Sequence, residues 1–189
     1  MKVQEPEHVL RVLKQAKLAV RNNDNIKLKQ LSNQTVHSSS IYQDPDNILV
    51  AVIIYALSKI IERPSYQEYP GWNTFFKHFL KHIDYSIVYL GKKDFFNLRE
   101  ELMKIRREIS KLTGEFKKRV EEVFKKAEIN KASKLYEHGL SLEKTAKLFG
   151  ISLWELAEYT GQSRSSETNI TVTMPVRDRV KLAQSIFKK

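Results

Sequence analysis

The sequence predicts a mainly α-helical protein, and three observations support this. Apolar residues recur at steps of three and four along most of the 189-residue chain, which is the repeat of helices with one buried face. The intervals between these segments carry Asn, Asp, Gly and Pro, which cap or end helices. Strand-like alternation is confined to one short stretch near the C-terminus. We expect a helical bundle at 1–92, a long basic connecting helix at 93–130, a helix-turn-helix module at 131–162 and a linker with a strand-helix tail at 163–189.

Four helices are expected in the N-terminal bundle. The first, at 6–21, is amphipathic, and the second spans 26–38. The third, at 46–62, follows an Asp-Pro start signal and is apolar on nearly every face, which indicates burial in a bundle or against a second subunit. The fourth, at 73–90, carries a stripe of phenylalanines that we interpret as core rather than as a base-stacking surface.

Two histidines of the fourth helix, His78 and His82, lie one turn apart and could hold a metal ion. The residues between them include no glutamate, so the pattern is not that of a metalloprotease. We interpret this face as solvated and expect no metal.

A heptad-like seam runs from Leu98 to Val123 and predicts one long helix. Its polar positions carry more lysine and arginine than glutamate. They could form a solvated face with local ion pairs, or a basic ridge that lies along phosphates or pairs with a partner helix. Together with the apolar third helix, the seam suggests a homodimer.

The segment SLEKTAKLFGISLWELAEYT carries the most specific pattern in the chain. Ser141 can cap a first helix, and Gly150 supplies the positive φ of a tight turn. Ser152 and Glu155 have the spacing of a capping box at the start of a second helix. The small Ala146 allows that helix to approach closely. The segment predicts a helix-turn-helix, which places its second helix in a DNA groove, and the alternative is a plain helical hairpin.

This segment also resembles the core of a family of small prokaryotic proteins that carry a G-x-S-L-x-x-A-A-x-L-x-G-x-S-L-W-E-F motif. The matching residues are Gly139, Ser141, Leu142, Ala146, Leu148, Gly150, Ser152, Leu153, Trp154 and Glu155. Thr145 and Leu156 depart from the motif, and the resemblance covers at most the last third of the chain. The family is thought to comprise antitoxin-like partners of PIN-domain ribonucleases, so the resemblance implies a protein partner.

The C-terminal stretch predicts one short strand and one short helix. A polar linker at 161–168 precedes an alternating strand at 170–174 and an amphipathic helix at 176–187. A lone strand needs a partner, so this one would pair with a second chain, with the module or with a ligand protein.

The composition favours a binding protein. The net charge of +11 and the pI near 9.7 attract polyanions such as nucleic acid, ribosomes or an acidic membrane face. The chain has no cysteine, which excludes disulfides and thiolate metal sites. It shows no signal peptide and no membrane-spanning stretch, so we expect a cytoplasmic protein without a membrane partner. It also lacks a phosphate-binding glycine loop and any catalytic set, so we expect neither enzyme activity nor a cofactor.

We therefore expect a nucleic-acid-binding protein, a transcriptional or RNA-associated regulator with DNA preferred to RNA. The candidate nucleic-acid-binding residues are basic, or they lie at the start of the second helix of the module: Lys144, Lys147, Ser152, Leu153, Trp154, Arg106, Arg107, Lys117, Lys118, Arg119, Arg164, Arg177 and Arg179.

An alternative function follows from the start of that second helix. It lacks the Arg, Asn and Gln side chains that read base edges in duplex DNA. Leu153 and Trp154 instead resemble an anchor for a protein groove, and Trp154 could also stack on an unpaired base. The alternative is a protein-docking module, such as an antitoxin-like toxin neutraliser or a ribosome-associated factor.

Overall fold

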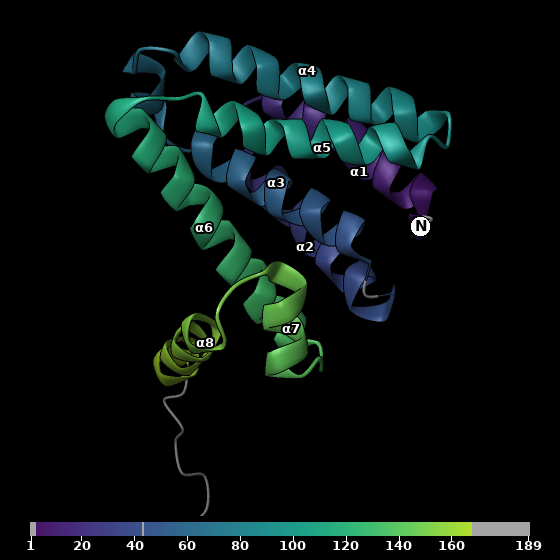
Figure 1. The fold of residues 1–189 in the computed structure, drawn as a ribbon, viewed down its shortest axis with the longest axis vertical. Helices are drawn as coiled ribbons and strands as arrows, with labels where there is room; N and C mark the ends of the chain where they lie inside the picture. Colours follow the sequence, from purple (N-terminus) through teal and green to yellow (C-terminus); the bar gives the residue numbers. More distant parts are fainter. Residues whose placement is uncertain (1–2, 43, 168–189) are drawn as a thin grey trace, which may run out of the picture.

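The computed structural model of the chain describes residues 3–42 and 44–167, and within these ranges it is helical throughout, with no strand (Figure 1). The elements are α1 (Pro6–Arg21), α2 (Asn25–Tyr42), α3 (Pro45–Ile61), η1 (Pro64–Glu68, a 3₁₀ helix), α4 (Trp72–Gly91), α5 (Phe95–Ser110), α6 (Gly114–Glu137), α7 (Leu142–Phe149) and α8 (Leu153–Glu167). This confirms the mainly α prediction. The strand expected at 170–174 and the helix expected at 176–187 lie outside the described residues.

Two aspartates cap the helices that follow them, and the first belongs to the predicted Asp-Pro start signal. A side-chain oxygen of Asp44 accepts a hydrogen bond of 2.9 Å from the backbone N–H of Asp46 at the start of α3. Asp94 accepts one of 3.1 Å from the backbone N–H of Asn97 at the start of α5. Each bond satisfies an N–H group that the first turn of a helix leaves without a partner.

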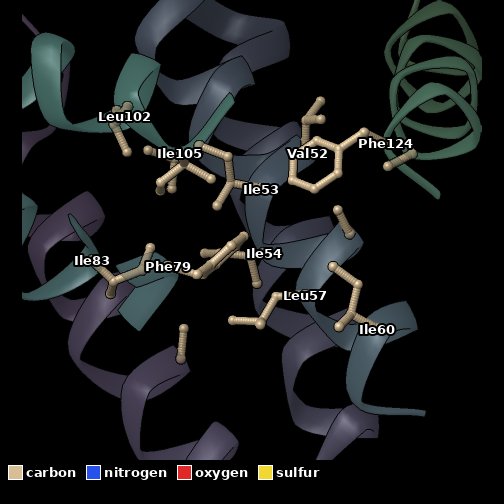
Figure 2. Close-up of a cluster of buried hydrophobic side chains, with 14 of the residues drawn as sticks. Val52, Ile53, Ile54, Leu57, Ile60, Phe79, Ile83, Leu102, Ile105 and Phe124 are labelled. Atoms are coloured by element: carbon tan, nitrogen blue, oxygen red, sulfur yellow. The ribbon is translucent and has the colours of Figure 1, made fainter. Parts of the chain in front are cut away.

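The core is organised around α3. In Figure 1, α4 and α5 lie side by side with α1 behind them, α2 lies along α3, and α6 crosses the bundle diagonally. Figure 2 shows Ile54 and Leu57 of α3 facing Phe79 of α4, with Phe124 of α6 on the opposite side of α3. Because α3 is covered by several helices, its apolar residues are buried on nearly every face, as predicted for a helix inside a bundle.

The phenylalanine stripe of α4 belongs to the core, as predicted. Phe75 and Phe79 are almost fully buried. Phe116 of α6 lies edge-on to Phe75, with ring centroids 5.8 Å apart, and stacks on Tyr69, with centroids 5.3 Å apart. Edge-on and offset-stacked rings of this kind stabilise a packed core.

The prediction of a single long helix at 93–130 is wrong. The chain forms two helices, α5 and α6, which are separated at 111–113 and run in different directions (Figure 1). Thr113 is extended and Gly114 has a φ of 60°, and neither conformation continues a helix. The apolar seam crosses this break because each helix turns its own apolar face into the same core. The seam is buried within the chain, so it no longer supports a coiled-coil dimer.

The expected linker at 161–168 also needs correction, because α8 continues through Gly161 to Glu167. Glycine and serine lower helix propensity by about 1 kcal/mol or less per residue, which does not stop a helix that has already begun. A polar composition alone therefore does not mark the end of a helix.

The histidines of α4 do not form a solvated face. His82 is mostly buried against α5, where its Nδ1 lies 2.7 Å from a carboxylate oxygen of Glu101. His78 is partly exposed, and its Nδ1 lies 2.9 Å from a carboxylate oxygen of Glu108. Both glutamates are buried, because they lie on the side of α5 that packs against α4. Across residues 3–42 and 44–167, no three acidic or histidine side chains come together as a metal site.

Acid is expected to weaken this contact between α4 and α5. Burial alone would raise the pKa of Glu101 and Glu108, but hydrogen bonds from lysines and from the two histidines outweigh it and lower both pKa values. Such carboxylates stabilise the fold above their unfolded pKa, and this stabilisation is lost as the pH falls through the folded pKa. We expect the free energy of unfolding in urea to fall between about pH 5.5 and about pH 3. This fall should be about 1–2 kcal/mol larger in the wild type than in the Glu101→Gln/Glu108→Gln variant.

The matched control for this measurement is Glu115→Gln, which removes an exposed glutamate that pairs with Arg119. It should lose as much stability in acid as the wild type. Equal acid sensitivity in the double variant and the wild type would contradict the prediction.

Candidate nucleic-acid interface

The predicted helix-turn-helix is present, with α7 as its first helix and α8 as its second. Ser141 caps α7, and its hydroxyl oxygen accepts a hydrogen bond of 3.3 Å from the backbone N–H of Lys144. Gly150 ends α7 with a φ of 65° and a ψ of 27°, the left-handed conformation that glycine adopts without strain. The chain therefore turns at the predicted residue and does not continue as one helix.

A capping box starts α8. The backbone N–H of Glu155 donates to the hydroxyl oxygen of Ser152 at 3.1 Å, and the backbone N–H of Ser152 donates to a carboxylate oxygen of Glu155 at 3.2 Å. Lys125 of α6 lies 2.7 Å from the other oxygen of that carboxylate. Its hydrogen bond, followed by those from Ser152, lowers the pKa of Glu155 to about 2. The same glutamate thus caps α8 and ties it to α6.

Small residues bring the three helices of the module together. Ala132 of α6, Ala146 of α7 and Leu156 of α8 form a buried cluster, and partly buried apolar side chains of α7 and the turn pack around it. Phe149 of α7 also packs against the bundle. The module therefore shares α6 with the bundle.

The first turn of α8 exposes two apolar side chains. Trp154 is 85% exposed and Leu153 is 47% exposed. The hydroxyl of Ser152 is committed to the capping box, since it both accepts from the backbone N–H of Glu155 and donates to its carboxylate at 2.9 Å. We therefore expect Ser152 to contribute structure rather than a contact to phosphate.

The basic residues expected on one long helix are mostly engaged with acidic neighbours. Arg106 pairs with Glu128, Arg107 with Glu100, Lys117 with Glu121 and Arg119 with Glu115. This arrangement matches a solvated face with local ion pairs better than a continuous basic ridge, because the cations lie on two helices and already have counter-ions.

Three of the candidate cations have no ion pair within the described part of the chain: Lys118, Lys144 and Lys147. Two of them, Lys144 and Lys147, are exposed on α7 of the module. Nothing is described of the Arg164 side chain, and Arg177 and Arg179 lie beyond the described residues. Among the described candidates, the exposed Lys144, Lys147, Leu153 and Trp154 therefore lie together near the turn.

One group of residues was not predicted from the sequence. A hollow of about 430 Å³ opens between α3, α6 and α8, next to the module. It is lined by Tyr55, Lys59, Arg63, Val123, Lys126, Ile129, Asn130 and Tyr159. A signal was present at Tyr55 and Lys59, since both are polar positions four residues apart in an otherwise apolar helix.

In comparisons with protein-family models, curated proteins and solved structures, nothing matched this chain. The resemblance to the antitoxin-like family therefore stays a prediction. No helix in residues 3–42 and 44–167 is both long enough and apolar enough to cross a membrane.

Proposed function

We propose that the protein binds nucleic acid through its helix-turn-helix module and acts as a regulator. The observation that carries this proposal is Trp154, whose side chain is 85% exposed on the first turn of the second helix. In a helix-turn-helix, this end of the second helix is the part that meets bases. Lys144 and Lys147 on the preceding helix and the net charge of +11 supply attraction to phosphates.

The chemistry of this surface suits unpaired bases better than the edges of a DNA duplex. Leu153 and Trp154 carry no group that forms paired hydrogen bonds with a base edge, whereas an indole ring stacks on any base. Stacking of one base on an aromatic side chain contributes about 1–3 kcal/mol. We therefore expect a single-stranded RNA or DNA segment to bind more tightly than a duplex.

The second candidate function is protein docking. The adjacent exposed side chains of Leu153 and Trp154 form an apolar pair of the kind that anchors protein interfaces. A toxin-like partner, as the family resemblance implies, would bury this pair, and its binding would depend little on salt.

The full chain can be titrated against labelled single-stranded RNA, single-stranded DNA and the corresponding duplex at several salt concentrations. We expect Trp154→Ala to weaken single-strand binding about 5- to 150-fold, as the loss of one stacked base predicts. Lys144→Gln/Lys147→Gln should lower the slope of log affinity against log salt, because two phosphate contacts are lost.

The matched control is Phe96→Ala, which removes an aromatic side chain that is 74% exposed on α5, outside the module. It should change the affinity less than about twofold. The absence of binding to all three nucleic acids at low salt would overturn the proposal and favour docking.

A further inference from the structure

The hollow between α3, α6 and α8 has the size and lining of a small-ligand site. Its volume of about 430 Å³ lies within the range of about 300–1,000 Å³ for such sites. Val123 and Ile129 of α6 give it apolar walls, and Tyr55 and Tyr159 add two aromatic rings. Burial raises the pKa of the Tyr55 hydroxyl, and the neighbouring Tyr159 raises it further. The two tyrosines thus lie close together on opposite elements, which favours a flat aromatic ligand.

An amide in the lining of the hollow, that of Asn130, has a hydrogen-bonding atom without a partner among the described residues. Nδ2 of Asn130 donates to the hydroxyl oxygen of Tyr159 at 3.1 Å. Oδ1 of the same side chain is buried and has no hydrogen-bond partner among the described residues. Buried polar atoms are rarely left without a partner.

The lining of the hollow also carries positive charge. Its three cationic side chains are Lys59, Arg63 and Lys126. Lys59 shares Glu62 with Lys29, at 2.9 and 2.7 Å. Lys126 pairs with Glu122 at 2.5 Å, and Arg63 donates to the hydroxyl of Tyr66 at 2.9 Å. Lys29 included, these described residues comprise four cations and two carboxylates, and the surplus of positive charge favours an anionic ligand.

A second hollow of about 380 Å³ adjoins the first, because Arg63 and Lys126 line both. Its further lining includes Ser65, Tyr69 and Arg119, which supply hydroxyl and guanidinium groups, and Glu122, whose carboxylate pairs with Lys126. The two arginines and one lysine of this lining can donate several hydrogen bonds to phosphate oxygens. An apolar aromatic hollow thus adjoins one in which three cations outnumber a single carboxylate.

We propose that these two hollows bind a nucleotide, with its base beside Tyr55 and Tyr159 and its phosphates at Arg63 and Lys126. This inference does not rest on the function proposed for Trp154. Tyr159 follows Trp154 by five residues, which places it about 140° around α8 on another face of the helix. The ligand is either a free nucleotide or an unpaired nucleotide within a strand, since both present the same base and phosphate.

The test is calorimetric titration of the full chain with each of ATP, GTP, CTP and UTP, with the matching nucleosides, with tripolyphosphate and with single-stranded decamers of the same bases. We expect at least one triphosphate to bind about tenfold more tightly than its nucleoside and than tripolyphosphate, because both hollows contribute. A decamer that binds more tightly than the nucleotide identifies a strand as the ligand, and the reverse identifies a free nucleotide.

Variants then locate the site. Arg63→Gln should weaken nucleotide binding about tenfold, and Asn130→Asp should weaken it as well, because it adds a negative charge beside the base. The matched control is Lys118→Gln, which removes an exposed cation of α6 that lines neither hollow. It should change binding less than about twofold.

Two results would overturn the inference. One is the absence of preference for any nucleotide over both its nucleoside and tripolyphosphate. The other is an equal effect of Arg63→Gln and Lys118→Gln. Either result leaves the function of the module standing if Trp154→Ala still weakens single-strand binding.

Discussion

Replacing Phe79 with alanine is expected to lower the free energy of unfolding by about 3–5 kcal/mol. The ring is fully buried and lies beside Ile54 and Ile83 in Figure 2. It also packs edge-on to Phe75, with ring centroids 5.9 Å apart. Truncation removes apolar contacts between α3 and α4 and leaves a cavity that the surrounding helices fill only in part. Urea denaturation followed by circular dichroism measures the change.

The matched control is Phe96→Ala, which deletes the same side chain where it is 74% exposed on α5. We expect its effect to stay within about 0.5 kcal/mol. Similar losses in both variants would mean that α4 does not pack against the core as described.

Replacing Lys131 with methionine is expected to raise the free energy of unfolding by about 1–4 kcal/mol near neutral pH. The lysine is fully buried in α6, where its Nζ lies 2.8 Å from Oδ1 of Asn33 and 4.0 Å from the ring centroid of Tyr55. Burial, followed by the nearby charge of Lys134, lowers the pKa of Lys131 to about 7. Methionine has a similar length without the charge, so it removes the cost of burying an ammonium group.

The sign of the pH dependence follows from this pKa. Between about pH 7 and the unfolded value of 10.5, the folded state holds Lys131 neutral while the unfolded chain keeps its proton. The unfolded state then binds more protons, so the stability of the wild type rises with pH across this window. In Lys131→Met, we expect this rise to be absent, and its advantage over the wild type to shrink as the pH rises.

The control for Lys131→Met is Lys134→Met, on the same helix but half-exposed and 4.0 Å from a carboxylate oxygen of Glu137. It should change stability by less than about 1 kcal/mol. Destabilisation of Lys131→Met at every pH would show that the contacts with Asn33 and Tyr55 outweigh the cost of burial.

Most helices could be predicted because their signals are local. The Asp44 and Asp94 caps, the capping box of Ser152 and the glycine turn at Gly150 each involve residues within a few positions of one another. The break at 111–113 was missed because apolar spacing continues across it. Periodicity reports which residues are buried, but it does not report whether two consecutive buried faces belong to one helix.

The two candidate sites, the start of α8 and the hollow between α3, α6 and α8, also differ in whether their residues are close in the sequence. The exposed start of α8 could be predicted, because the turn and its neighbours lie in one segment of the sequence. The hollow between α3, α6 and α8 could not be predicted, because Tyr55, Asn130 and Tyr159 come from three helices that only the folded chain brings together. The ion pairs on α5 and α6 were equally hidden, since Arg106 finds its partner in Glu128, on another helix.

The continuity of α6 has a consequence for dissecting the protein. Its first half, around Phe116 and Val123, packs into the bundle core. In its second half, Ala132 belongs to the cluster that joins α7 and α8, and Leu135 packs with Val36 and Ile48 of the bundle and with side chains of α7. A C-terminal fragment that begins at residues 111–113 would expose to water the apolar side of α6 that packs against the bundle. A fragment that begins near residue 130 would lack most of α6, against which α7 and α8 pack. The helix-turn-helix module is therefore not an independent folding unit, and it should be transferred, crystallised or assayed only with the bundle attached.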